Sequence, residues 1–133
     1  MEEFAEYILN EKDLITKIEI ISFLAPKLGI NFDKSIIFKT EVARMFLKYS
    51  KPNVDNNLVL TACLLCNCKK VDDAQKIGKL TTYAVEGAQH LKKLGFDERF
   101  CKICEGVNRY SKIKTREPES DILELADQFG GML

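Results

Sequence analysis

The chain has 133 residues, of which 46% are hydrophobic, and this is enough apolar material for one continuous core. Lys plus Arg and Asp plus Glu both number 20, so the formal net charge is zero and no whole-molecule field attracts nucleic acid or an anionic membrane. The acidic N-terminal segment matches neither a signal peptide nor a transit peptide, and no apolar run approaches the roughly 20 residues of a membrane span. We therefore expect a cytoplasmic protein that binds neither membranes nor nucleic acid.

The spacing of apolar residues predicts an all-α fold, because helical periodicity dominates and no strand-like alternation is sustained. A short helix is expected near residues 4–9, and a second over residues 13–28 that stops at Gly29. Asp33 is the expected N-cap of a third helix over residues 33–49. The buried side of this third helix is expected to carry Ile36, Ile37, Val42, Met45 and Phe46.

The fourth helix is expected to start at Asp55 or Asn53, and its stretch over residues 58–68 is apolar on almost every face. We therefore expect this stretch to run through the centre of the molecule.

The rest of the chain predicts further helical segments. These are a short turn of helix over 72–78, a helix capped by Thr81 that ends at Gly95, one from Asp97 to about Tyr110, and a last one from Pro118 to about Phe129. Residues 1–133 thus read as one domain of about seven helices. The residues expected to be mostly buried are Leu60, Leu64, Val85, Leu91, Leu94, Ile103, Ile122, Leu125 and Ala126.

Five cysteines form two CxxC patterns, Cys63 with Cys66 and Cys101 with Cys104, and Cys68 follows the first pattern. Two such pairs are compatible with a structural zinc site or with redox chemistry. Zinc knuckles usually place CxxC in a tight turn, whereas these pairs lie inside apolar helical patterns, where residues i and i+3 share a face. We therefore predict reduced, buried thiols that bind no metal.

His90 is the only histidine, and on its predicted helix the buried positions are Ala88, Leu91 and Leu94, so His90 is expected to face solvent. Without a second imidazole, a Cys-His or Ser-His-Asp arrangement has no other candidate base.

Four segments resemble a known family in their order along the chain. EVARMF, LVLTACLLCNCKK, VEGAQHLKKLGF and ILELADQFGGM are similar to the VA-containing helix, the AALLHDIGK segment, the GAELLRKLGF segment and the closing helix of the HD superfamily of phosphohydrolases, especially its HD-GYP subgroup. The third segment is the most specific. The resemblance implies an HD-like helical fold over residues 38–132, with residues 1–30 as additional N-terminal helices.

The resemblance also implies where metal ligands would stand, because working HD domains hold metal ions with His and Asp side chains. The matching positions are Phe38, Cys66, Asn67, Tyr83, Gly106, Val107 and Asp127. Only Asp127 keeps a ligand side chain, and one carboxylate cannot hold the hard divalent ion that activates water. Phe38 and Val107 are expected to fill the space of the metal with apolar side chains. Asp127 is expected to persist for a structural hydrogen bond, with Arg109 or Lys70 as its partner.

These observations favour a non-catalytic HD-like module without metal or cofactor, similar to the metal-free HDOD relatives, that binds a protein partner or a small ligand in bacterial signalling or regulation. Basic side chains are candidate contacts for a phosphate-bearing ligand, although a solvated surface also explains them: Lys69, Lys70, Arg109 and Lys112. The alternative is a hydrolase with a rebuilt site made of Cys66, Asn67, Tyr83 and Asp127. Association of the domain with itself is a third hypothesis, which the sequence does not separate from the first.

Overall fold

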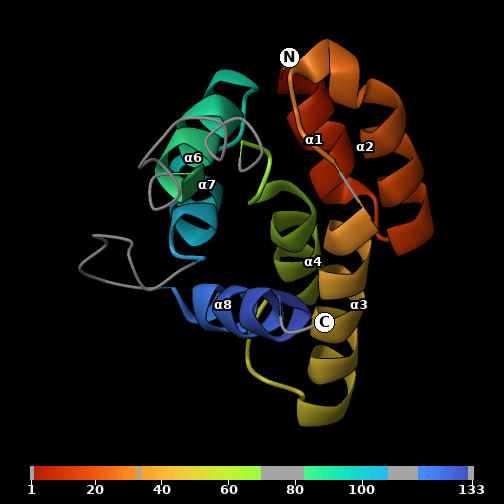
Figure 1. Ribbon diagram of the computed structural model, residues 1–133, viewed down its shortest axis with the longest axis vertical. Coiled ribbons are helices and arrows are strands. Elements are labelled where there is room, and N and C mark those ends of the chain that lie inside the picture. The colour runs from red at the N-terminus through yellow and green to blue at the C-terminus, as the bar shows by residue number, and fades with distance from the viewer. Residues whose placement is uncertain (1, 33, 70–82, 108–116, 132–133) are drawn as a thin grey trace.

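The computed structural model describes residues 2–32, 34–69, 83–107 and 117–131, and these residues form helices and their connections (Figure 1). The helices are α1 (Glu2–Asn10), α2 (Leu14–Leu28), α3 (Lys34–Ser50), α4 (Asn56–Leu65), α6 (Tyr83–Lys93), α7 (Glu98–Glu105) and α8 (Pro118–Gly131). The all-α prediction is confirmed, with seven helices and no strand in the described ranges. The expected caps at Asp33 and Thr81 and the expected turn over 72–78 lie outside them.

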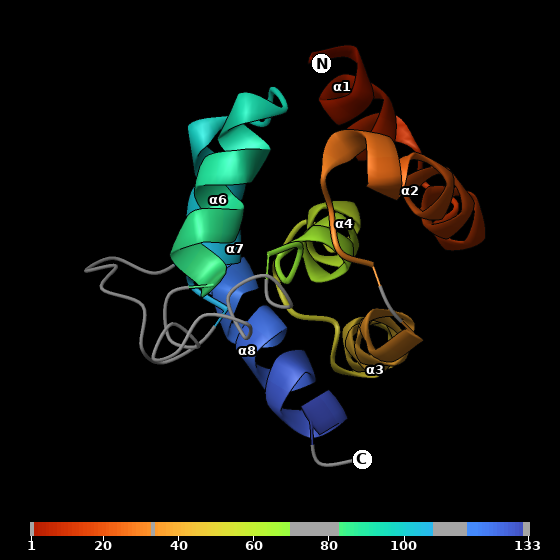
Figure 2. The ribbon, with the colours of Figure 1, turned by 45° about the horizontal axis from the view of Figure 1, so that its top comes forward.

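Helix α4 lies at the centre, as predicted. It contacts α1, α2, α3, α7 and α8, and Figure 2 shows these helices arranged around it. Residues 61–68 are all buried, although the regular helix ends at Leu65 and the last of them form turns. None of the helices in the described ranges has the length and apolar character needed to cross a membrane.

Several helices begin or end at capping residues that can be recognised in the sequence. Asp13, Asp55 and Asp97 are N-caps whose carboxylates accept a hydrogen bond from the backbone N–H three residues later, at 3.0, 3.1 and 2.8 Å. Gly29 ends α2 in the left-handed conformation, with a φ of 69°, which a residue with a Cβ rarely adopts. The caps predicted at Asp55, Asp97 and Gly29 are therefore confirmed.

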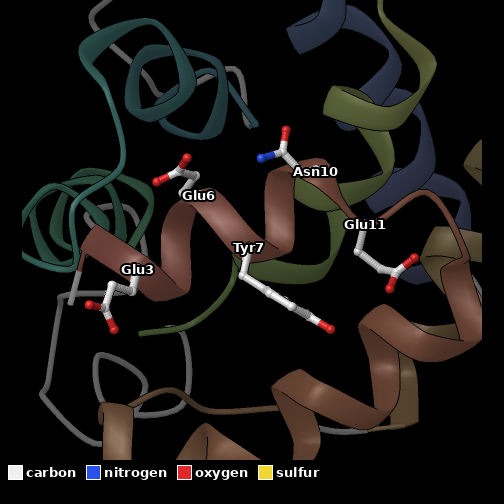
Figure 3. Close-up of a pocket in the computed structure, with 5 residues that line it drawn as sticks. All are labelled: Glu3, Glu6, Tyr7, Asn10 and Glu11. Carbon is white, nitrogen blue, oxygen red and sulfur yellow. The ribbon is translucent and has the colours of Figure 1, made fainter.

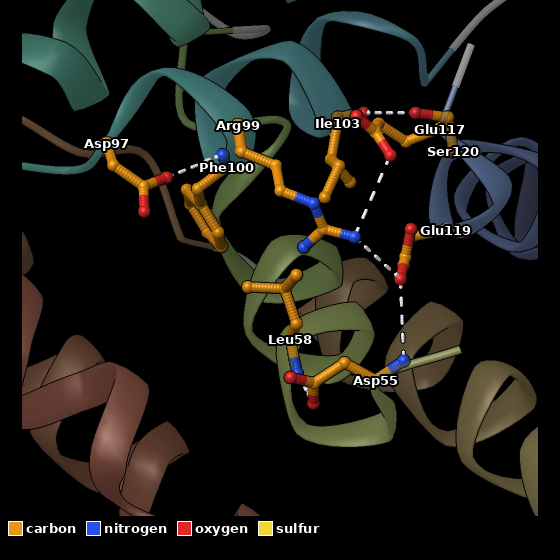
Figure 4. A network of polar contacts seen from close by, with 9 residues as sticks. All are labelled: Asp55, Leu58, Asp97, Arg99, Phe100, Ile103, Glu117, Glu119 and Ser120. Atoms are coloured by element: carbon orange, nitrogen blue, oxygen red, sulfur yellow. Dashed lines mark hydrogen bonds and ion pairs between the residues drawn. The ribbon is translucent and has the colours of Figure 1, made fainter. Parts of the chain in front are cut away.

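An ionic network joins α7 and α8 to the start of α4 (Figure 4). Arg99 on α7 binds Glu119 of α8 at 3.1 Å, and Glu119 also accepts the backbone N–H of Asp55 at 3.4 Å. Beside it, Ser120 donates its hydroxyl to the Ile103 carbonyl at 2.9 Å. The first turn of α8 is therefore held to α4 and α7 at the same time.

Helix α3 turns a different face to the core from the one that the sequence predicted. Ile36 is buried and Val42 and Phe46 are half-buried, but Ile37 and Met45 are exposed, so the prediction was wrong for these two residues. The buried face also carries two polar side chains, those of Lys39 and Thr40. Both can be buried because each has a hydrogen-bond partner. Lys39 donates to Asp127, and the hydroxyl of Thr40 donates to the carbonyl of Ile36 in the same helix.

The other predicted core positions are mostly confirmed. Leu64, Leu91, Leu94, Ile103, Ile122 and Ala126 are buried, and Leu60 and Val85 are half-buried. Leu125 is exposed, which contradicts the prediction. The buried side of α8 is formed by residues 119, 120, 122, 123 and 126, and the helical period of 3.6 residues places Leu125 on the other side.

Lys17 is a fully buried side chain that the sequence did not single out. Its ammonium donates a hydrogen bond to the Ile8 carbonyl at 2.6 Å, in the last turn of α1, and another to the hydroxyl of Thr61 on α4. One cation on α2 thereby joins three helices and satisfies a helix-terminal carbonyl. Burial lowers the pKa of Lys17 to about 8, against the opposing influence of Glu11 and Asp55.

We expect Lys17 to make folding stability rise with pH in the alkaline range. The pKa is about 8 in the folded chain and about 10.5 without the shift, so between these values the unfolded chain binds more protons and the cost of burying the charge is relieved as pH rises. Between about pH 7 and about pH 10, the free energy of unfolding of the wild type should rise by on the order of 2–3 kcal/mol more than that of Lys17→Met. Urea unfolding at the two pH values measures this difference. Ionisation of the thiols contributes equally to both proteins, so it does not affect the difference between them. If the free energies of unfolding of the two proteins changed in parallel with pH, this assignment would be contradicted.

Candidate functional site

A buried polar cluster lies where α3, α8 and the turn after α4 meet. The ammonium of Lys39 donates to Oδ1 of Asp127 at 2.8 Å, and Nδ2 of Asn67 donates to the same oxygen at 3.2 Å. The side chains of Lys39 and Asp127 are only 9% and 16% exposed, and Asn67 is buried. These three residues are called the Lys39 cluster below.

The fold brings these three groups together from distant parts of the chain. Lys39 lies on the buried face of α3, one turn after Ile36, and Asp127 follows the buried Ala126 on α8. Asn67 is placed by the turn that ends the buried segment of α4. In this position the Oδ1 atom of Asn67 is buried and has no hydrogen-bond partner in the described residues.

The structural hydrogen bond expected at Asp127 is present, but its partners differ from the expected ones. Lys39 and Asn67 bind the carboxylate, whereas Arg109 and Lys70 lie outside the described residues. Sequence reasoning missed Lys39 because a lysine in an amphipathic helix is normally assigned to solvent. The available signal was its spacing from Ile36 and Ala43, which places all three on one helix face.

The positions that the family resemblance matches to metal ligands come together only in part. Asn67 and Asp127 are in direct contact, and Cys66 is close enough for Asp127 to contribute to the rise of its pKa. Phe38 was expected to fill this space, but its side chain is 44% exposed, so that expectation was wrong. The next residue along the helix, Lys39, points inward in its place.

The positions on α6 and α7 are not part of the Lys39 cluster. Gly106 packs against the start of α8, where an added Cβ would lie 2.7 Å from the hydroxyl of Ser120. Ser120 is seven residues before Asp127, which is about 10 Å along a helix. Val107 is fully buried, as an apolar core position should be. Tyr83 begins α6, and its side chain is outside the described part of the chain.

The five thiols are all buried and free of disulfides, which confirms the predicted burial. Burial raises the pKa of Cys63 to about 12 and that of Cys101 to about 11, and it raises the pKa of Cys66 and Cys104 well above the usual range. Because the thiolate is the reactive form, these groups are poor nucleophiles at neutral pH. No group of three or more His, Cys, Asp or Glu side chains suited to a metal ion occurs within the described ranges.

His90 does not face solvent, which corrects the sequence prediction. Its half-buried ring donates from Nε2 to the carbonyl of Leu28 at 2.7 Å, at the C-terminal end of α2. Lys69 donates to the neighbouring carbonyl of Gly29 at 2.8 Å. Both side chains therefore satisfy carbonyls that the end of the helix leaves without partners. The sequence does not reveal this role, because His90 is 62 residues from its partner.

Two cavities are lined by residues outside the Lys39 cluster. A cavity of about 410 Å³ runs along α1 and is lined by Glu3, Glu6, Tyr7, Asn10 and Glu11 (Figure 3). Three carboxylates make this cavity unsuitable for an anionic ligand. A smaller cavity of about 250 Å³ lies between α6 and α7, and its charged lining residues have both signs.

Comparison with models of protein families, with curated proteins and with solved structures finds no match for this chain.

We expect the Lys39 cluster to stabilise the fold as a unit. Asp127→Asn leaves the ammonium without its counter-charge, and Lys39→Met leaves the carboxylate without its own, so each should lower the free energy of unfolding by about 2–4 kcal/mol. The double variant Lys39→Met/Asp127→Asn should lose clearly less than the sum of the two. The matched control is Arg44→Gln, because Arg44 and Glu41 form an exposed pair on the same helix, worth under about 1 kcal/mol. Additive losses in the double variant would contradict the proposed pairing.

We also expect slow modification of the thiols in the native protein. A thiol reagent followed by mass spectrometry should label Cys101 first, because Cys101 is the least buried of the five and its pKa of about 11 is raised less than that of the others whose shifts are resolved. The remaining thiols should react only after denaturant is added. Rapid labelling of Cys63 or Cys66, or stoichiometric zinc that survives chelation, would contradict this assignment.

Proposed function

We propose that this chain is a non-catalytic HD-like module that acts by binding a partner. The observation that supports the proposal is the Lys39 cluster. Asp127 and Asn67 stand at two positions that the family resemblance assigns to metal ligands, and here the carboxylate of Asp127 accepts hydrogen bonds from the ammonium of Lys39 and from Nδ2 of Asn67. A cation from the chain itself thus neutralises the one carboxylate that the resemblance retains.

The chemistry of this cluster argues against phosphoester hydrolysis. A divalent ion at Asp127 would be repelled by the ammonium 2.8 Å from the carboxylate and would find few other oxygen or imidazole donors. The family reaction depends on a coordinated ion that lowers the pKa of a water molecule from 15.7 toward about 7. The residues present fit this role poorly, so we derive no hydrolytic step through a metal.

The alternative, a hydrolase with a rebuilt site, is less well supported. Cys66 would be its nucleophile, but burial raises the pKa of this thiol well above the usual range. Asn67 uses its Nδ2 group to bind Asp127, and the same Oδ1 atom of Asp127 also accepts a hydrogen bond from the ammonium of Lys39, so this oxygen is already engaged. This set lacks an activated nucleophile with a free general base.

Among binding roles, the described surface favours a protein partner over a phosphate-bearing ligand. Lys69 is engaged at the end of α2, and Lys70, Arg109 and Lys112 lie outside the described residues. The larger cavity is acidic. Several large apolar side chains are exposed, including Phe23, Met45 and Tyr49. We place this role in bacterial signalling or regulation in the cytoplasm, as the resemblance implies.

The test is a pair of measurements on purified protein. We expect no turnover of nucleotides, cyclic dinucleotides or generic phosphodiesters with added manganese, iron or magnesium. Calorimetry should show no Mn²⁺ binding to the wild type, whereas Lys39→His, which removes the ammonium and adds an imidazole beside Asp127, should bind Mn²⁺ measurably and at least about 10-fold more tightly than a histidine placed at an exposed position. Lys48→His, at an exposed position of the same helix, is the control. Metal-dependent turnover that Asp127→Ala abolishes would refute the proposal.

A further inference from the structure

Helix α3 carries a second apolar stripe, and three of its four residues are exposed. Phe38, Val42, Met45 and Tyr49 are separated by four, three and four residues, which places them along one line of the helix. Phe38, Met45 and Tyr49 are 44%, 49% and 73% exposed, and Val42 is half-buried. These four residues are called the α3 stripe. Their spacing is the one by which two helices pack side by side in a coiled coil.

We propose that the α3 stripe is a self-association surface, on which α3 of a second copy of this chain packs in the antiparallel direction. In that arrangement Phe38 lies opposite Tyr49 of the second copy, and Val42 lies opposite Met45. The same pairs recur when the two copies are exchanged, because a two-fold axis passes between Val42 and Met45. The interface therefore uses one patch on both copies, as two-fold dimers do.

The charges beside the stripe favour the antiparallel direction. Glu41 and Lys48 flank the stripe on its solvent side and are seven residues apart, about 10 Å along the helix, so they do not pair within one chain. In the antiparallel dimer Glu41 lies opposite Lys48 of the second copy, and this pair occurs twice. A parallel arrangement does not bring these two side chains together.

The polar surroundings of the stripe are compatible with this interface. Glu41 binds Arg44 on its own helix at 2.5 Å, but both side chains are nearly half exposed, so the carboxylate remains accessible to a second cation. On the other flank, the ammonium of Lys39 is neutralised by Asp127 and therefore presents no unpaired charge to the second copy. The chain has no net charge, so two copies do not repel each other at long range.

A second copy is favoured over an unrelated helix because the stripe and its flanking charges complement themselves. The contact involves about three turns of helix on each copy and is therefore smaller than a standard interface, so we expect a dissociation constant of roughly 1–100 μM. This inference names a second copy of the chain as the partner in the binding role proposed above. It rests on the proposed function only in treating self-association as that role. A protein that dimerised and also hydrolysed phosphoesters would refute the proposed function but not the dimer.

The deciding experiment is sedimentation velocity of the full chain from about 1 to about 300 μM. The wild type should pass from monomer to dimer. Glu41→Lys places two lysines opposite each other at both ends of the interface, and Lys48→Glu does the same with two carboxylates, so each should raise the dissociation constant about 10-fold or more. The double variant Glu41→Lys/Lys48→Glu should return to within about 3-fold of the wild type. This swap does not restore the contact of residue 41 with Arg44, so recovery reports the pairing between copies.

Two further variants separate association from folding. Met45→Lys should abolish the dimer and leave helicity and urea unfolding unchanged, because Met45 is exposed in the monomer. Phe23→Ala should leave the dimer intact, since Phe23 is an exposed aromatic residue on α2 and not part of the stripe. A protein that stays monomeric over the whole range, a dimer that survives Met45→Lys, or a charge swap that gives no recovery would each overturn the inference.

Discussion

The second half of α4 and the turn after it have no residue exposed to water, and this constraint determines where the other helices lie. Residues 61–68 are all buried, so their polar atoms must find partners inside the protein. At one end the hydroxyl of Thr61 accepts a hydrogen bond from Lys17, and at the other end Asn67 donates to Asp127, which binds Lys39. Two buried ammonium groups, on α2 and α3, are thus positioned by polar residues at opposite ends of one apolar segment.

The fold class and most helix ends could be predicted because they depend on neighbouring residues. An aspartate three residues before the N–H that it caps, or a glycine after an apolar run, is visible in any short window, as Asp55, Asp97 and Gly29 show. The orientation of α3 could not be predicted in this way. This helix has one apolar line through Ile36 and Ala43 and another through Phe38 and Met45, and only the packed structure shows which one faces the core.

The candidate site was predictable at Asp127 and unpredictable at the groups that pair with it. A carboxylate that directly follows a predicted core residue, as Asp127 follows Ala126, suggests a buried partner, but the partner Lys39 is 88 residues away. The partner of His90 could not be predicted either, because its ring binds the backbone carbonyl of Leu28 in another helix. Every residue has a backbone carbonyl, so the amino-acid sequence does not indicate which one is bound. Long-range polar pairs of this kind depend on tertiary geometry, whereas the pattern of apolar residues records only which face of a helix is buried.

The position of Lys17 between three helices has a consequence for how the protein unfolds. Its ammonium loses water only when the last turn of α1 and the hydroxyl of Thr61 on α4 are both in place to accept its protons. If α4 separates, the ammonium loses the hydroxyl of Thr61, and α1 and α2 keep few contacts with each other because each packs mainly on α4. We therefore expect the N-terminal helices to unfold together with the central one, in a single cooperative transition.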